Sequence, residues 1–129
     1  MSNTILSLKL LKDSFAVCRL NKNEQIPDWA LSNSFYSIVK TEDELSIVCL
    51  ENSVPNNVKQ ERDWRVLKIE GPLDFSLIGI LSKISSILAK EKISIFAIST
   101  YDTDYILVKN AEIENAIKAL SNEEYNIIQ

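Results

Sequence analysis

Two carboxylates stand close together in the segment ISIFAISTYDTDYILV, which covers residues 93–108. Asp102 and Asp104 lie in a short polar corner between two apolar stretches of this segment. An aspartate at the beginning of a strand can accept charge-assisted hydrogen bonds from an ammonium group or a cationic side chain. An aspartate in a turn also commonly accepts hydrogen bonds from nearby backbone N–H groups. We expect Asp104 to bind a ligand and Asp102 to stabilise the turn, and the turn role stays open for Asp104 as well.

The residue types that most catalytic and metal sites need are missing from the sequence. There is no histidine and there are only two cysteines, which excludes a Ser–His or Cys–His nucleophile pair and a structural zinc site. The two glycines, Gly71 and Gly79, are too few for a phosphate-binding loop or a dinucleotide fingerprint. Two acids on one short corner also do not match the separated carboxylates of a glycoside hydrolase cleft. We therefore expect no enzyme activity, no cofactor and no bound metal.

Charge and hydropathy limit the possible partners and the compartment. The formal net charge of −4 and the pI near 4.9 argue against nucleic acid or an anionic membrane as the main partner. The segment WRVLKIE, residues 64–70, lacks the basic, doubly aromatic signature of RNA-binding ferredoxin-like domains. Trp29 and Trp64 are interpreted as core or interface residues, not as a platform for stacking. The start MSNTILSLKLLKD lacks the features of a signal peptide, and no apolar run is long enough to span a bilayer. We expect a cytoplasmic protein whose Cys18 and Cys49 are reduced, buried thiols.

The second half of the chain alternates strand-like and helix-like patterns. WRVLKIE predicts a strand that stops at the Gly-Pro pair 71–72, and Asp74 or Ser76 can cap the helix that follows. The segment 93–108 predicts two strands, Asn110 can cap a second helix, and EYNIIQ predicts a last strand. Apolar residues recur at helical spacing in both helices: Leu77, Ile80, Leu81, Ile84, Ile87 and Leu88 in the first, and Ile113, Ala116, Ile117 and Leu120 in the second. The order βαββαβ predicts an α+β, ferredoxin-like unit.

The first half repeats this order in a reduced form. Its predicted strands cover residues 4–11, 14–20, 35–41 and 44–50, PDWAL supplies one short helical turn, and the polar stretch 51–63 supplies a turn and a connection. Shifted by 60 residues, FYSIVKTEDELSIV aligns with IFAISTYDTDYILV, although two acidic hairpins can also match by chance. We predict two tandem ferredoxin-like units, residues 1–60 and 61–129, with antiparallel sheets, helices on one face and a degenerate first unit.

The segment EGPLDFSLIGILSKISSILAKEKISIFAISTYDTDYILV, residues 70–108, resembles the ACT-domain proteins, specifically the small bacterial tandem-ACT proteins related to the CASTOR arginine sensors. PDWAL and DELSIV extend the resemblance into the first half, so that it covers nearly the whole chain. The resemblance implies a regulatory module that binds amino acids or similar small ligands, typically where two such units pair. It also implies a degenerate first half and a ligand contact at the position of Asp104. It does not fix which ligand is bound.

A free amino acid is a zwitterion, so its pocket must donate hydrogen bonds to a carboxylate and accept them from an ammonium group. The first-turn amides of a helix lack partners within the helix and carry the positive end of its dipole, which makes the amides of residues 75–78 candidate donors. Gly79 either lets a ligand or a partner backbone approach closely or merely eases helix packing. Asp104 and two backbone carbonyls of the neighbouring strand are candidate acceptors. The candidate ligand-binding residues are Phe75, Ser76, Leu77, Ile78, Gly79, Ile98, Ser99 and Asp104.

Two functions fit these patterns. The first is a regulatory module that senses a free amino acid, or a similar small zwitterion, at an interface between ACT units. The alternative is a structural or protein-interaction module whose ligand pocket has closed, with bulky side chains of the first half beside Asp104. The expected partners are the amino acid and either a second copy of the chain or a regulated protein, but neither nucleic acid nor a membrane.

Overall fold

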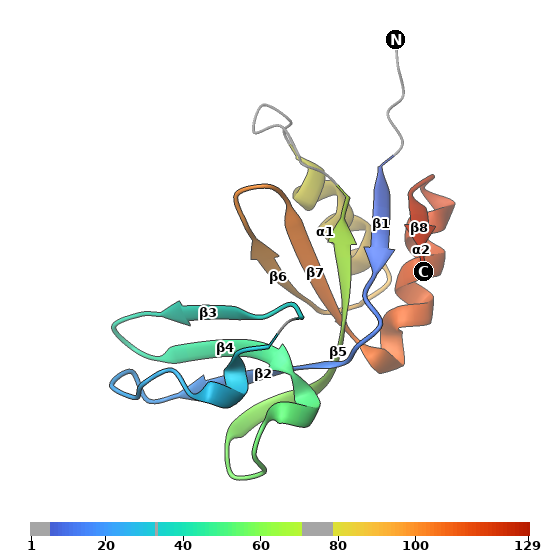
Figure 1. Cartoon of the computed structure of the whole chain (residues 1–129). Coiled ribbons are helices and arrows are strands. Elements are labelled where there is room, and N and C mark those ends of the chain that lie inside the picture. Colours follow the sequence, from blue (N-terminus) through green and yellow to red (C-terminus); the bar gives the residue numbers. More distant parts are fainter. Residues whose placement is uncertain (1–5, 33, 71–78) are drawn as a thin grey trace. The chain divides into compact units, whose positions relative to one another are not determined.

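The chain folds into two compact units. The computed structural model describes residues 6–32, 34–70 and 79–129. One unit, the small unit, is Asp13–Trp64, and the other, the large unit, combines Met1–Lys12 with Arg65–Gln129. Both are mixtures of strands and helical segments (Figure 1), as the α+β prediction requires. No helix in the described ranges is long and apolar enough to cross a membrane.

The large unit is the more regular of the two. Its elements are β1 (Ser7–Leu10), the last residues of β5 (Lys59–Ile69), α1 (Ile80–Lys90), β6 (Ile95–Ser99), β7 (Asp104–Lys109), a 3₁₀ turn η3 (Asn110–Glu112), α2 (Ile113–Asn122) and β8 (Asn126–Ile128). From β5 onward this is the predicted βαββαβ order. The strands lie in the order β6-β7-β5-β1-β8, and β1 is inserted between β5, to which it is antiparallel, and β8, to which it is parallel.

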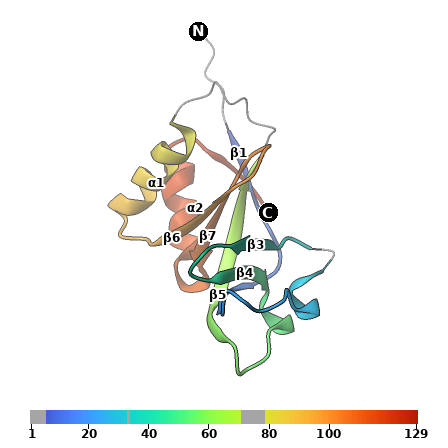
Figure 2. The ribbon, with the colours of Figure 1, turned by 90° about the vertical axis from the view of Figure 1, so that its left-hand side faces the viewer.

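Both helices lie on the same side of the large unit's sheet (Figure 2) and share one apolar core with it. Ile84 and Leu88 of α1 and Leu120 of α2 are fully buried, because the apolar residues recur once per helical turn and face the sheet. Asn110, predicted as a cap of the second helix, begins η3 instead and makes no capping hydrogen bond. Its side chain accepts a 3.4 Å hydrogen bond from Nη1 of Arg65, so the prediction of a cap is wrong.

The small unit repeats the order of the large unit with 3₁₀ turns in place of helices. Its elements are β2 (Phe15–Leu20), η1 (Asp28–Ala30), β3 (Ser37–Lys40), β4 (Leu45–Leu50), η2 (Glu51–Ser53) and the first residues of β5. In both units the second and third strands lie at one edge of the sheet, followed by the first and then the fourth. This order is β3-β4-β2-β5 in the small unit and β6-β7-β5-β8 in the large unit, where β1 is inserted between β5 and β8. PDWAL and ENSV are too short for a full helix, since an isolated helix needs more than one turn to offset its nucleation cost. The prediction of two ferredoxin-like units with a degenerate first one is confirmed.

One strand, β5, belongs to both units. The sequence predicts a strand only from Trp64, but β5 begins at Lys59 and pairs with β2 over its first residues. The stretch was missed because residues 59–63 are polar and none of them is buried. A β-bulge follows, where the pairing steps from Val17↔Glu61 to Phe15↔Trp64. Asp63 in this bulge has a φ of 68°, and its N–H donates a 2.8 Å hydrogen bond to Oε1 of Glu51.

The expected division at residue 60 differs from this arrangement. Residues up to Lys12 belong with the large unit, because β1 pairs with the last part of β5 and with β8. The register Leu8↔Ile69 places Leu8 in the middle of that sheet, where it is fully buried. Because both strands that pair with β1 do so through large-unit residues, β1 belongs to the large unit, and the small unit is inserted into its sequence between Lys12 and Arg65.

Cys18 and Cys49 lie next to each other in the core of the small unit. Both are buried and free, as the sequence predicted. Cys18 faces Ile47 and Cys49 faces Ala16 across the β2–β4 ladder, which makes the two thiols diagonal neighbours on one face. The hydrogen bond between the thiols and, after it, burial raise the pKa of Cys18 well above its usual range.

Replacing Leu8 by Ala should destabilise the large unit. Its strand lies between β5 and β8, and its side chain is fully buried in the core of the large unit. Truncation removes apolar contacts and leaves a cavity, at a cost of about 2–5 kcal/mol. Lys9→Ala, on the exposed face of the same strand, is the matched control and should change the free energy of unfolding by less than about 0.5 kcal/mol. Urea denaturation measures both. Equal stability of the two variants would show that β1 is not part of this sheet.

The two thiols should resist modification in the folded protein. A thiol reagent such as 5,5′-dithiobis(2-nitrobenzoate) attacks the thiolate. The hydrogen bond between the thiols raises the pKa of Cys18 and lowers the pKa of Cys49, so the resistance of Cys49 depends on its burial, which keeps both sulfurs out of reach of the reagent. We expect essentially no colour at pH 8 from native protein and two equivalents after addition of guanidinium chloride. Rapid release of colour from the native state would mean that the core of the small unit opens easily.

Candidate functional site

The candidate site lies at the end of the large unit's sheet where β5 stops and β7 begins. Thr103, the residue before β7, is buried, and its hydroxyl donates a 2.6 Å hydrogen bond to the carbonyl of Ile69, the last residue of β5. The N–H of Glu70, the next residue, donates to the carbonyl of Ser7 at 2.8 Å. The ends of three strands are therefore fixed to one another. The tip of the β6–β7 hairpin lies at the same end of the sheet as the arrowhead of β5 (Figure 1).

Asp104 is the first residue of β7 and faces Ser99, the last residue of β6. The Ser99 hydroxyl donates a 2.5 Å hydrogen bond to Oδ1 of Asp104. Because side chains alternate along a strand, Asp104 lies on the same face as Ile106 and Val108, which belong to the core under the helices. The carboxylate thus stands half-buried at the end of the helix-covered face, held by one hydroxyl and with acceptor capacity to spare.

The turn between the two strands is closed by threonines. The N–H and the hydroxyl of Thr100 both donate to the carbonyl of Thr103, at 2.8 and 3.0 Å. The N–H of Thr103 donates back to the Thr100 hydroxyl at 3.3 Å. Asp102, expected to stabilise the turn, is exposed, and these closing bonds come from the threonines instead. The sequence analysis missed Thr103, for which the only signal was a β-branched hydroxyl residue between two acids.

The backbone of Ser99 is better placed than that of Ile98 to accept a hydrogen bond from a ligand. Thr100 and Thr103 form a hydrogen-bonded pair, so the next pair along an antiparallel ladder, Ser99 and Asp104, is a non-hydrogen-bonded pair. The carbonyl of Ser99 therefore points away from β7, whereas that of Ile98 is used in pairing with Tyr105. In the described part of the chain β6 pairs only with β7, which leaves its outer edge open.

Gly79 is required by the backbone at the start of α1. Its φ is 80°, in the left-handed region, and it directly precedes the first residue of the helix. A Cβ placed on it would meet none of the described atoms within 4 Å. The conformation of the turn therefore accounts for this glycine without any packing contact among the described atoms, and the approach of a ligand or a partner backbone to it stays a prediction. Its carbonyl accepts the N–H of Lys83 at 2.8 Å, which begins the helical ladder.

The remaining predicted donors, Phe75, Ser76, Leu77 and Ile78, lie outside the described residues. The structure thus brings Asp104 and Ser99 together at one strand end and puts the turn at Gly79 ahead of α1. Among the described residues, no group of three or more His, Cys, Asp or Glu side chains is arranged to hold a metal. What the described part offers is a set of acceptors, a carboxylate and a carbonyl, of the kind that an ammonium group requires.

Thr103→Val should weaken the link between β5 and the hairpin. The variant keeps the shape of the side chain but leaves the buried carbonyl of Ile69 without its hydroxyl partner, which costs about 1–3 kcal/mol. Thr103→Ser keeps the hydroxyl and serves as the matched control, with the smaller loss expected for one methyl group. Guanidinium denaturation compares the two. The link has no energetic role if the valine variant is at least as stable as the serine variant.

The chain was compared with known families and structures. Residues 59–122 match the ACT domain family, and residues 13–57 match a family described as an N-terminal domain. Among curated proteins, none matches the chain. The crystal structure of a protein from Agobacterium tumefaciens is 36% identical, with a TM-score of 0.92, over 98% of this chain and 94% of that chain.

Two similar structures are an aspartate kinase and the regulatory subunit of another. The chain matches the regulatory subunit of the Thermus thermophilus enzyme in its ligand-free form at 11% identity and a TM-score of 0.62, over 92% of this chain and 98% of that chain. It matches the aspartate kinase of Clostridium acetobutylicum, described as an allosteric enzyme, at 15% identity and a TM-score of 0.66, over 91% of this chain and 34% of that chain. At these identities the likeness shows the fold alone.

Proposed function

Residues 59–122 belong to the ACT domain family, and from that premise we propose that the chain is a regulatory module that binds a free amino acid and performs no catalysis itself. The matched family and the regulatory subunit among the similar structures support a ligand-binding regulatory role. The relationship to the CASTOR arginine sensors stays a prediction, as does the identity of the amino acid.

The observation that carries the proposal is the pairing of Asp104 with Ser99 at the end of β5. The carboxylate of Asp104 and the outward carbonyl of Ser99 are both acceptors, and an ammonium group can donate to each of them. A charge-assisted bond to a carboxylate is roughly twice as strong as a neutral one, so the ammonium group is the natural occupant. The carbonyl of Ile98 is used in the pairing with Tyr105, so Ile98 can contact the ligand only through its side chain.

The proposal assigns the ligand's carboxylate to the amides of residues 75–78 and Gly79. Because α1 begins at Ile80, Gly79 alone of these residues stands directly at the helix entry, where amides without partners within the helix carry the positive end of its dipole and favour an anion. The segment connects the end of β5, where Thr103 is bonded, to the start of α1. Support for this assignment therefore comes from the sequence alone, in which the candidate donors follow the end of β5 and precede α1.

Binding alone does not make a signal. A ligand changes an equilibrium only by the difference in its affinity for two states, so the module must pair with a second copy or with a regulated protein differently when occupied. A structural or protein-interaction module without a ligand stays the alternative. The hydrogen bond from Ser99 favours it, because that bond already uses part of the acceptor capacity of Asp104.

Thermal melts with each of the twenty amino acids test the proposal. A ligand that binds only the folded state adds about 2.7 kcal/mol at 100 times its dissociation constant, which raises the melting temperature in a dose-dependent way. Asp104→Asn should remove most of the shift, because it removes the charge that pairs with the ammonium group and keeps the shape.

Asp102→Asn is the control for that variant, since it removes the same charge two residues away on the exposed turn. It should keep the full shift. The sensing function is contradicted if no amino acid shifts the melt. The assignment to Asp104, but not the function, is contradicted if the Asp104 variant responds like the wild type.

A further inference from the structure

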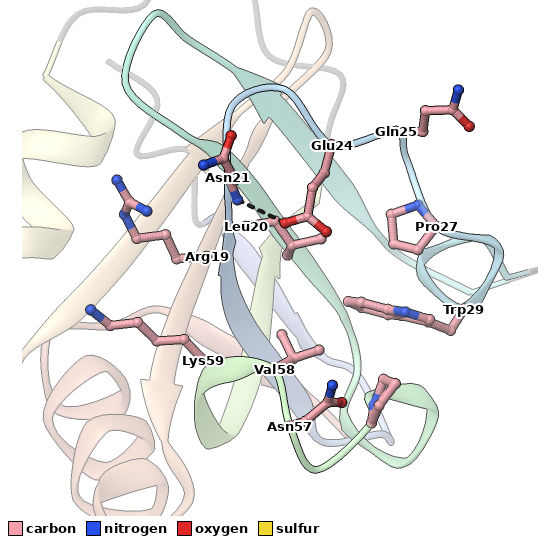
Figure 3. A pocket seen from close by; sticks show the side chains of 11 residues that line it. Arg19, Leu20, Asn21, Glu24, Gln25, Pro27, Trp29, Asn57, Val58 and Lys59 are labelled. Carbon is pink, nitrogen blue, oxygen red and sulfur yellow. Dashed lines mark hydrogen bonds between the residues drawn. The ribbon is translucent and has the colours of Figure 1, made fainter.

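A hollow lies in the small unit, and none of the residues assigned above lines it. It has a volume of about 460 Å³, within the usual size of a small-molecule site, and is formed by the end of β2, the loop that leads to η1 and the residues just before β5. Figure 3 shows it from close by. Leu20 and Val58 contribute apolar walls, Trp29 lies along one side and Asn57 stands at the rim.

Two cationic side chains also line the hollow, but their charged ends are directed away from Trp29. Arg19 and Lys59 face each other across the β2–β5 ladder, next to Leu20 and Val58 in the sequence. Because side chains alternate along a strand, they leave on the face opposite to the apolar walls. Figure 3 shows both charged ends directed away from Trp29, and Nη2 of Arg19 donates to the carbonyl of Asp43 at 3.1 Å.

The ionised group that does point into the hollow is the carboxylate of Glu24. Its side chain runs from the loop toward Trp29 and Val58, whereas Gln25 next to it points outward (Figure 3). The backbone N–H of Asn21 donates a 3.0 Å hydrogen bond to Oε2 of Glu24 and fixes the direction of the side chain. The Asn21 side chain is used elsewhere, accepting the N–H of Asn23 at 2.9 Å. Oε1 of Glu24 is left to face the hollow.

Trp29 is positioned by the fold and only half-buried. It belongs to η1 and packs against the core of the small unit, while the rest of the indole lines the hollow. The negative face of an indole attracts a cation. From the sequence, Trp29 was expected to be a core or interface residue. Part of its side chain does pack against the core of the small unit, and another part lines the hollow.

We propose that this hollow binds a small organic cation, an ammonium or guanidinium group on a short apolar stem. The cationic head pairs with Oε1 of Glu24 and lies against the indole of Trp29, and the stem contacts Leu20 and Val58. An anion is repelled by Glu24, whereas the charged ends of Arg19 and Lys59, which also line the hollow, are directed away from Trp29. This site is independent of the amino acid site at Asp104, and each can fail without the other.

Nuclear magnetic resonance of the full ¹⁵N-labelled chain tests the site directly. The chain has two tryptophans, so two indole N–H signals are available, and a Trp29→Phe variant assigns them. Titration with n-butylammonium and n-butylguanidinium chloride should move the Trp29 signal saturably and leave that of Trp64 nearly unchanged. Sodium butyrate and n-butanol, at the same ionic strength, should bind at least about tenfold more weakly, because neither can form the charge-assisted bond.

Glu24→Gln keeps an acceptor for the N–H of Asn21 and removes only the charge, so it should fold normally and lose about tenfold in affinity for both cations. Glu42→Gln removes a charge from the β3–β4 turn of the same unit, outside the hollow, and should bind as the wild type does. The proposal is overturned if the Trp29 signal shows no saturable movement, if butyrate or butanol binds as tightly as the cations, or if the Glu24 variant keeps full affinity.

Discussion

A single strand, β5, has to pair with β2 at its beginning and with β1 at its end, and the rest of the architecture depends on that. The bulge at Asp63 separates the two stretches, because the extra residue breaks the ladder with β2 just before the last part of the strand turns to β1 and β7. Asp63 bears the left-handed backbone that the bulge needs, and Glu51 bonds its N–H. Each unit thus has a complete sheet only while β5 is continuous.

The double pairing of β5 also determines where a binding site can form. The end of β5 is fixed by the hydroxyl of Thr103 on one side and by the pairing of β1 on the other. The start of β7 and the end of β6 therefore lie together with the end of β5 at one end of a sheet that packs one face against two helices. Polar groups at such an end lie close to a buried, low-dielectric core, where a charge-assisted bond is stronger than it is in open water.

The sequence was informative where apolar spacing is regular and silent where contacts are made by polar residues. Both helices and β6 and β7 followed from periodicity, since burying one face is what places apolar residues at these intervals. Residues 59–63 show no such spacing, because that part of β5 buries none of its side chains, and the true start of the strand was missed. Asn110 had the residue type of a cap, but the competing contact with Arg65 decided its position.

For the sites, residue types suggested Asp104 and Ser99, whereas Thr103 and the meeting of Glu24 with Trp29 could not be inferred. Those depend on how a turn and an irregular loop fold, and neither has a periodic pattern to read. The signals were present only as isolated residues: a hydroxyl between two acids, and a tryptophan following a proline and an aspartate. The roles of these residues can be inferred only after the fold has brought residues that are distant in the sequence together.

The most direct test of the central claim is a crystal structure of the chain grown with the amino acid that most raises its melting temperature. The account predicts electron density for one amino acid at the end of β5, with its ammonium group within hydrogen-bond distance of a carboxylate oxygen of Asp104 and of the carbonyl of Ser99. Density for the amino acid at any other place, with Asp104 still bonded to Ser99 alone, would contradict it.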